Sequence, residues 1–415
     1  MTLWNPEYRI KVNGSTVTSA TLAGMTITSG RTDIYSQPYA GYCNLQLLET
    51  TLGSIPYDIN DAVSVEVKKT NGSYVFLFGG FMTDVEIRVN SSGSSATTQF
   101  VSIIAVGALA RLARATFDGN ISSDQDGDQI AAILGTVLFD TWNEVPGATT
   151  WNTYDPTITW ANAQNSGYGE IDQPGDYELD SQNNVLDSVY NVVSQIATSG
   201  LGYIYEDAEG RIGYADSTHR GQYLAANGYV DLDGRHCLAP GLSIAKRAGN
   251  VRNSITISYG SAGNASVTDS DPDSIANYGE LAASVRTTLK NQSDAEAQAA
   301  FYLDIRSNPQ FEMAQITFPL GSPEIDNTDR DSLLQVSMAL PLNIQNLPGN
   351  MTNGEYQGFV EGWTWQAGYN ALSLTLYLSP VAYSLQAFAW DDVPVNETWQ
   401  TINQTMTWLQ ATIVS

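Results

Sequence analysis

Residues 62–67 read AVSVEV and residues 75–87 read VFLFGGFMTDVEI. In the first stretch apolar residues alternate with polar ones, which is the period of a β-strand with one buried and one wet face. The same alternation occurs at residues 8–12 and 85–89, and it places Glu66 and the charged residues of those strands on the wet side. The region up to about residue 110 is therefore predicted to be a β-barrel or sandwich.

Gly79 and Gly80 interrupt the apolar run that begins at Tyr74. Glycine inside a strand pattern weakens it and often marks a bulge or a tight bend. The pair is therefore expected to separate two strands. A further strand at residues 99–104 is expected to complete this first domain.

The period then changes to that of helices. Apolar residues recur at helical spacing over residues 128–140, and again from Val185 to Ile196 before a stop at Gly200. Residues 203–214 have the pattern of a β-hairpin with a turn at Asp207–Gly210. A middle domain at 111–244 is expected, with residues 145–182, rich in Gly, Pro, Asn and Asp, as a loop insertion.

Strand patterns return after residue 245. Residues 255–259 and 372–378 alternate as strands do, and Ser293 with Glu296 forms the pattern of a helix-initiating capping box. A second β-domain with helical insertions is predicted at 245–384, followed by a Trp-rich extension at 385–415. The expected fold class is mainly β with α+β parts, in which two β-barrel domains flank a helix-containing α/β segment.

The chain is strongly acidic. Its 415 residues carry 44 acids and 18 bases, a formal charge of −26, and residues 121–245 hold 18 of the acids against three bases. Hydrophobic residues make up 42%, which is enough to build globular cores. A groove that binds nucleic acid stably needs clustered Lys and Arg, so this function is disfavoured. No signal peptide or membrane-spanning stretch is expected.

No catalytic, cofactor or metal site is expected. The motifs of serine hydrolases, P-loop proteins and zinc peptidases do not occur, and the only histidines, His219 and His236, are expected at the surface. Asp clusters at 124–128 and 269–273 resemble calcium loops but each lacks a required residue, so helix capping is expected instead. Cys43 and Cys237 do not indicate a disulfide. Acidic pairs leave a glycosidase as the weakest alternative.

A tryptophan motif occurs twice. Residues 150–160 and 398–408 both read Thr-Trp-x-Thr-x-x-x-Thr-x-Thr-Trp. These aromatic residues could pack in small hairpins, anchor a protein interface or stack on sugars. Docking on other proteins or neighbouring subunits is the preferred hypothesis, and the interface candidates are Trp151, Trp160, Trp390, Trp399 and Trp408.

Several of these stretches resemble a known family. Residues 62–67 and 75–87 look like a strand pair in tail-hub proteins of tailed phages. Residues 251–257, 273–279 and 359–380, with the Trp-rich segment from Trp390, are similar to minor tail proteins of actinobacterial phages. The similarity extends over about residues 1–410.

This resemblance implies a structural virion protein. In the family the hub is a homotrimeric ring at the tail tip, where two related β-barrels per subunit match the six-fold tail tube. Expected partners are two further copies, the tail tube or distal tail protein, the tape-measure protein and tip fibres. DNA would pass through the lumen without stable binding, and an acidic lumen would repel phosphates. The alternative is a receptor- or carbohydrate-binding tail protein.

Overall fold

A computed structural model gives the structure of the chain. It describes residues 4–49, 56–89, 98–141, 168–238, 242–260, 263–368 and 370–385, with side chains left out at 137–141 and 168–170.

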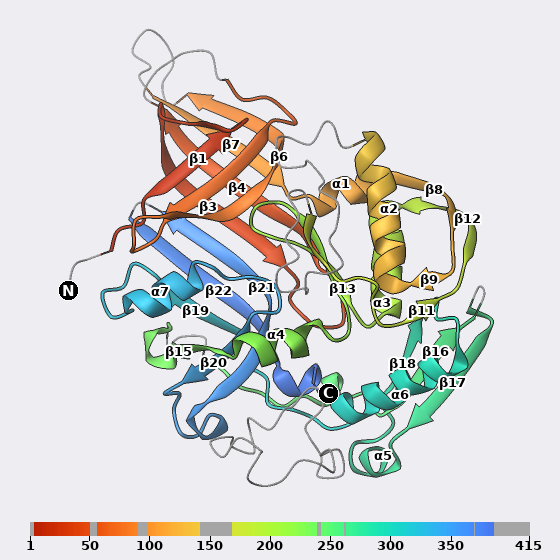
Figure 1. Ribbon diagram of the computed structural model, residues 1–415. Coiled ribbons are helices and arrows are strands. Elements are labelled where there is room, and N and C mark those ends of the chain that lie inside the picture. The colour runs from red at the N-terminus through yellow and green to blue at the C-terminus, as the bar shows by residue number, and fades with distance from the viewer. Residues whose placement is uncertain are drawn as a thin grey trace.

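The N-terminal strands form one antiparallel array (Figure 1). Their order is β3-β4-β7-β6-β5-β1-β2, so each strand pairs with neighbours on the same array. The bounds are β1 (Tyr8–Val12), β2 (Ser15–Thr16), β3 (Ala20–Gly30), β4 (Tyr39–Glu49), β5 (Ala62–Lys68), β6 (Tyr74–Val89) and β7 (Gln99–Val106). Alternate residues of β7 and of most of β4 are buried, as the period of two predicts.

The C-terminal strands continue this array into a 12-stranded sheet. They are β15 (Val230–Asp233), β19 (Gln315–Pro319), β20 (Pro341–Gln345), β21 (Tyr356–Gly368) and β22 (Ala371–Pro380). The first part of β21 pairs with β20, and residues 362–367 of the same strand pair with β3. β21 is thus the strand that joins the two halves of the chain.

The predicted class, mainly β with α/β parts, is confirmed. The arrangement differs from two separate barrels, because the β3–β21 pairing merges both sets of strands and no pairing among the described strands closes a barrel. The buried residues of both sets also form one hydrophobic core, the sheet core. Sequence periodicity shows which face of a strand is buried, but it does not show which other strand pairs with its edge. The architecture depends on that pairing.

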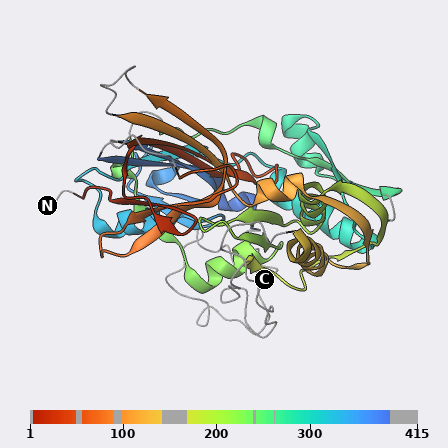
Figure 2. The ribbon, with the colours of Figure 1, turned by 90° about the horizontal axis from the view of Figure 1, so that it is seen from above.

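A second hydrophobic core, the lateral core, lies beside the sheet (Figures 1 and 2). It takes buried residues from the middle region and also from residues 255–303. Its helices are α1 (Leu109–Arg114), α2 (Asp126–Thr141), α3 (Val189–Ser199) and α6 (Gln292–Arg306). The strands of this part of the molecule are β8 (Thr116–Ile121), β9 (Asp124–Gln125), β10 (Tyr168–Ile171), β11 (Glu178–Leu179), β12 (Gln182–Ser188), β13 (Tyr203–Glu206), β14 (Ile212–Ala215), β16 (Ser254–Tyr259), β17 (Ala265–Ser270) and β18 (Ala282–Arg286).

Three further helices are α4 (His219–Asn227), α5 (Pro272–Tyr278) and α7 (Asn327–Leu333), and Leu333 of α7 belongs to the sheet core. Single 3-10 turns are η3 (Gly234–His236), η4 (Ala248–Asn250), η6 (Thr352–Gly354) and η7 (Val381–Tyr383). Asp271 caps α5 by accepting from the Ser274 N–H at 2.9 Å, as the capping hypothesis expected. The domain boundaries expected from the sequence stay predictions.

Helix α3 begins later than the periodicity predicts. Val185 belongs to β12 and pairs with Gly119 of β8. Ser188 has an extended backbone and its side chain accepts from the Asn191 N–H, so the helix starts at Val189. The predicted end before Gly200 is confirmed.

The glycine pair Gly79-Gly80 does not end a strand, because β6 runs through it. A Cβ added to Gly79 would stand 2.3 Å from the Glu209 carbonyl oxygen, in the turn between β13 and β14. The glycine therefore allows the hairpin of the lateral core to approach the backbone of the sheet. It marks a close approach between distant segments, which the local sequence cannot distinguish from a bend.

Glu66 is buried, although alternation placed it on a wet face. Arg9 and Lys11 of the neighbouring strand β1 both form ion pairs with its carboxylate. Arg9 also lies over the ring of Tyr74, 3.9 Å from its centroid. The two longer cations cover the carboxylate, so the charged side chains of this face bury one another.

Candidate functional site: the charged junction

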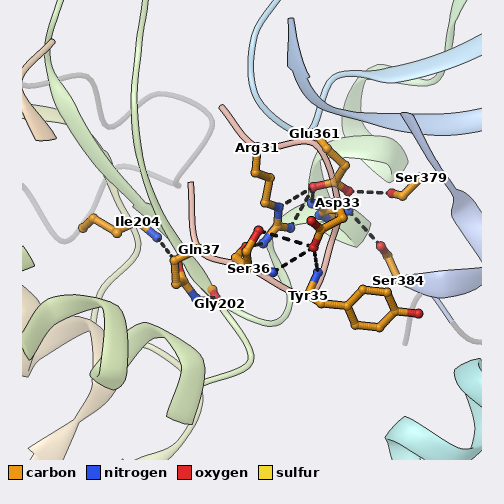
Figure 3. A network of polar contacts seen from close by, with 11 residues as sticks. Arg31, Asp33, Tyr35, Ser36, Gln37, Gly202, Ile204, Glu361, Ser379 and Ser384 are labelled. Atoms are coloured by element: carbon orange, nitrogen blue, oxygen red, sulfur yellow. Dashed lines mark hydrogen bonds and ion pairs between the residues drawn. The ribbon is translucent and has the colours of Figure 1, made fainter. Parts of the chain in front are cut away.

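The junction between the sheet core and the lateral core is built where β3 ends and β21 bulges (Figure 3). Gly30 and Gly362 are partners across the two strands. A Cβ on Gly30, whose φ is +81°, would lie 2.4 Å from the Glu361 carbonyl oxygen. The register of β21 against β22 shifts between Val360 and Gly362, so Glu361 is the bulged residue.

Glu361 binds two arginines that come from distant parts of the chain. Its Oε2 accepts from Arg31 Nε at 2.8 Å and from Arg220 Nη2 at 2.9 Å, and its Oε1 accepts from Arg220 Nη1 at 2.7 Å. Ser379 Oγ donates to the same Oε1 at 2.5 Å. We call Arg31, Arg220 and Glu361 the charged junction.

All three side chains of the charged junction are almost fully buried, and that of Glu361 is 1% exposed. Burial alone would raise the pKa of Glu361, but Arg220 and Arg31 outweigh it and hold this pKa well below its usual range. The carboxylate is therefore charged at neutral pH. Two cations against one anion leave the cluster with an excess positive charge inside the protein.

The loop between β3 and β4 links the charged junction to the lateral core. Gln37 accepts from the Ile204 N–H at 3.1 Å and donates to the Gly202 carbonyl at 3.1 Å (Figure 3). Tyr190 OH donates to the Pro38 carbonyl at 2.6 Å. Asp33 accepts from the backbone N–H groups of Tyr35 and Ser36 and so holds the loop in shape. The loop therefore fastens β13 and α3 to the end of β3.

Glu206 makes a second link between the same parts. Its carboxylate accepts from the Gly41 N–H at 2.5 Å and from the Leu109 N–H at 2.8 Å. Burial raises the pKa of Glu206 to about 7, although the two backbone donors favour the charged form. This side chain therefore changes charge within the physiological range.

His219 is buried, in contrast to the surface position that the sequence suggested. Its Nδ1 lies 2.8 Å from Asp172 Oδ2, and its backbone N–H donates to Asp216. These contacts fix the first residue of α4, and the next residue is Arg220. The histidine thus anchors the start of α4, the helix that carries Arg220.

A cavity of about 450 Å³ opens beside the charged junction. Five arginines line it, together with aromatic residues of the β3–β4 loop, α6 and η7. The five arginines are Arg31, Arg220, Arg252, Arg286 and Arg306. In a chain with 18 bases in total, this is a concentrated positive site.

One group of side chains among the described residues has the spacing of metal ligands: His236, Asp326 and Asp329. Asp329 Oδ2 accepts from the Asp233 N–H at 3.2 Å and lies 3.0 Å from His236 Nδ1. Asp326 caps α7 by accepting from the Asp329 N–H. Hydrogen bonds within the group thus account for its geometry.

The Asp cluster at 124–128 is engaged in protein contacts as well. Asp126 Oδ1 accepts from the backbone N–H groups of Asp176 and Tyr177, both at 2.9 Å, and Tyr214 OH donates to Oδ2. Burial raises the pKa of Asp126 to about 6. This carboxylate holds the segment after β10 against the start of α2.

The five tryptophans predicted as interface anchors, Trp151, Trp160, Trp390, Trp399 and Trp408, lie outside the described residues, so their role stays a prediction. The residues of the charged junction were not identified from the sequence. The one available signal was Glu361 itself, a charge inside the apolar run FVEGWTW. Cys43 and Cys237 are both free thiols. Within the described part of the chain, no helix has the length and apolar character to cross a bilayer.

Comparison with known proteins gives a fold relationship. No protein-family model and no curated protein matches the chain. The crystal structure of the 43 kDa tail protein of prophage MuSo2 from Shewanella oneidensis is similar, with a TM-score of 0.56 and 12% identity over 91% of this chain and 99% of that one. A tail protein from Neisseria meningitidis MC58 has a TM-score of 0.55 and 10% identity, over 92% and 98%. The chain therefore shares its fold with these tail proteins.

Proposed function

We propose that this protein is a structural component of a phage or prophage tail, and that it forms a homotrimeric hub ring at the tail tip. The observation that carries the proposal is the end-to-end fold match. It includes 91% of this chain and 99% of the Shewanella prophage tail protein, so the whole architecture is shared and not one common module. The phage-tail resemblance of the sequence supports the same family of functions.

The buried contacts between the two cores fit a subunit that has to resist mechanical force. Gln37, Tyr190 and Glu206 fasten the lateral core to the sheet core. The charged junction in turn joins β21 and α4 to the end of β3, beside these links. A ring subunit has to transmit force between neighbours without separating its parts. Several buried links between the two cores serve that requirement.

The surface of β6 offers a contact for a neighbouring subunit. The last residues of this strand extend beyond the sheet core, and Ile87 and Val89 are 50% and 51% exposed. Both side chains lie on the same face of the strand because they are two residues apart. In the proposed ring this apolar face is covered by another copy of the chain.

The acidic balance is compatible with a DNA passage in the proposed ring. With a formal charge of −26 on each chain, the assembly carries a net charge that repels phosphates. DNA can then move through the lumen without being retained. In this proposal the tail tube or distal tail protein, the tape-measure protein and tip fibres are the other partners.

The test is a map of assembled tails that contain this chain, in which we expect three copies per tail. A matched pair of variants locates the contact: Ile87→Asp is expected to reduce incorporation at least tenfold, whereas Leu186→Asp, at a site 71% exposed in the lateral part, is expected to incorporate normally. Both variants should keep the melting temperature of the wild type. One copy or six copies per tail would contradict the hub.

A further inference from the structure

The cavity beside the charged junction contains a buried cation whose hydrogen bonds are incomplete. Arg306, the last residue of α6, is 4% exposed and lines the cavity. Its Nε and Nη1 have no hydrogen-bond partner among the described residues. Buried charges are normally paired, because an unpaired charge in the protein interior is strongly unfavourable.

Aromatic contacts account for only part of the Arg306 environment. The guanidinium lies 4.2 Å from the ring centroid of Tyr383 and 5.1 Å from that of Tyr35. Tyr35 also interacts with Arg306 through a side-chain hydrogen bond, but the Nε–H and Nη1–H groups, which lie in the guanidinium plane, have no acceptor among the described residues. The in-plane donors therefore still need an acceptor.

The other charges of the cavity do not supply this acceptor. Glu361 is already bound by Arg31 and Arg220. Asp216 accepts from the N–H groups of Thr218 and His219 at the start of α4. Burial lowers the pKa of Arg306, and the neighbouring tyrosines and Glu361 offset this effect only in part.

Two more arginines give the cavity an excess of positive charge. Arg252 lies over the ring of Tyr35, 4.9 Å from its centroid, and its Nη1 donates to the Gly249 and Val251 carbonyls. Arg286 is exposed on β18. An anion that enters would thus meet these two charges and then Arg306, in a protein that otherwise repels anions.

The apolar side chains that line the cavity indicate what kind of molecule bears the anionic group. Phe301, Tyr302 and Ile305 of α6 and Ile34 of the β3–β4 loop line the same cavity. An isolated inorganic anion would gain nothing from these side chains. A carboxylate attached to an apolar or aromatic group would use both the walls and the donors.

We propose that this cavity is a binding site for a carboxylate carried on a peptide segment with a neighbouring apolar or aromatic residue. Arg306 donates to the carboxylate, and Arg252 and Arg286 attract it. The proposal does not depend on the function proposed above, because binding is measured on the isolated full-length protein. Two sources share this chemistry: the acidic C-terminal residues of this chain, Asp391 and Asp392, and an acidic segment of another protein.

The probes are two dipeptides that differ in one charge. We expect acetyl-Phe-Asp-amide to bind with a Kd tighter than about 1 mM, and its neutral match acetyl-Phe-Asn-amide to bind at least tenfold more weakly, which corresponds to ~1.4 kcal/mol. Isothermal titration calorimetry measures both. Inorganic phosphate is the third probe, and binding of phosphate without the Asp dipeptide would overturn the proposal.

The variants assign the site. Arg306→Gln should weaken the Asp dipeptide at least tenfold, whereas Arg235→Gln, an exposed arginine paired with Asp233, should leave its Kd unchanged. Arg306→Gln should also keep or raise the melting temperature of the free protein, since it removes a buried unpaired charge. Arg286→Gln, at the exposed edge, should weaken binding about two- to threefold at low salt, and the loss should shrink at high salt.

One further variant separates the two sources. If Asp391→Asn/Asp392→Asn in the full chain binds the Asp dipeptide more tightly than the wild type, the protein's own C-terminal acids compete for the site. If the affinity is unchanged, the natural carboxylate comes from another protein. The proposal is overturned if the Asp dipeptide binds neither the wild type nor this double variant, or if Arg306→Gln leaves its affinity unchanged.

Discussion

The side chain of Glu361 has two structural roles. It sits at the bulge of β21, and it neutralises arginines that lie 330 and 141 residues away in the sequence. Its hydrogen-bond donors are themselves buried, so removing the carboxylate leaves two cations without an anion. Loss of one partner of a buried pair is far more costly than loss of an exposed pair.

We therefore expect Glu361→Gln to lower the free energy of unfolding by about 3–5 kcal/mol. The matched control is Glu86→Gln, which removes an exposed carboxylate paired with Arg88 and should leave the stability nearly unchanged. Urea denaturation of the three proteins measures both values. Similar stabilities for the two variants would contradict the role given to the charged junction.

At the scale of elements, the contact between the two cores requires the backbone of a strand in the sheet to lie close to the backbone of a hairpin in the lateral core. The turn between β13 and β14 rests on Gly79 of β6, where a side chain would collide with the Glu209 carbonyl. Backbone atoms cannot move aside as a flexible side chain can. A methyl group at this position must displace the hairpin that carries Glu206.

Gly79→Ala is accordingly expected to destabilise the protein by about 1–3 kcal/mol. The control is Gly368→Ala, a glycine near the end of β21 with no atom within 4 Å of the added Cβ, for which little change is expected. Thermal unfolding measures the melting temperatures of both variants. The expectation is wrong if Gly79→Ala and Gly368→Ala have the same melting temperature.

The helices and strands also show which features the local sequence pattern predicts correctly and which it does not. The helix at 128–140, the hairpin at 203–214 and the strand at 372–378 are confirmed within a few residues. Val185 was assigned to a helix because its spacing to Val189 is helical, but pairing with β8 places it in a strand. Glu66 and His219 were expected at the surface because polar residues usually lie there, and each is buried because distant partners satisfy it.

At the scale of the whole molecule, buried carboxylates control the response to pH. Glu206, with a pKa of about 7, and Asp126, with a pKa of about 6, bind protons more tightly in the folded than in the unfolded chain. Their contribution to stability is thus complete below pH 4 and is lost as the pH rises to about 7. Glu361 acts in the opposite sense, because its pKa is lowered: its contribution is complete above about pH 5 and is lost progressively as the pH falls below its unfolded pKa.

The free energy of unfolding should therefore fall between about pH 4 and pH 7, by an amount on the order of 5 kcal/mol. Urea titrations at several pH values measure this slope. Asp126→Asn keeps the size of the side chain, and Tyr214 OH can accept from the new amide, so this variant should show a shallower slope between pH 4 and pH 6. A flat profile in the wild type would contradict the burial of these acids.

The sequence by itself determined the mainly β class, the places where helices interrupt the strands and the acidic surface that disfavours nucleic acid, because periodicity and charge are local properties of the chain. It also indicated the phage-tail resemblance, with which the shared fold agrees. Only the tertiary structure decided that β3 pairs with β21, that one sheet replaces separate barrels, and that five arginines line one cavity. Those features depend on which strand edges and side chains meet across hundreds of residues, and no local pattern encodes that pairing.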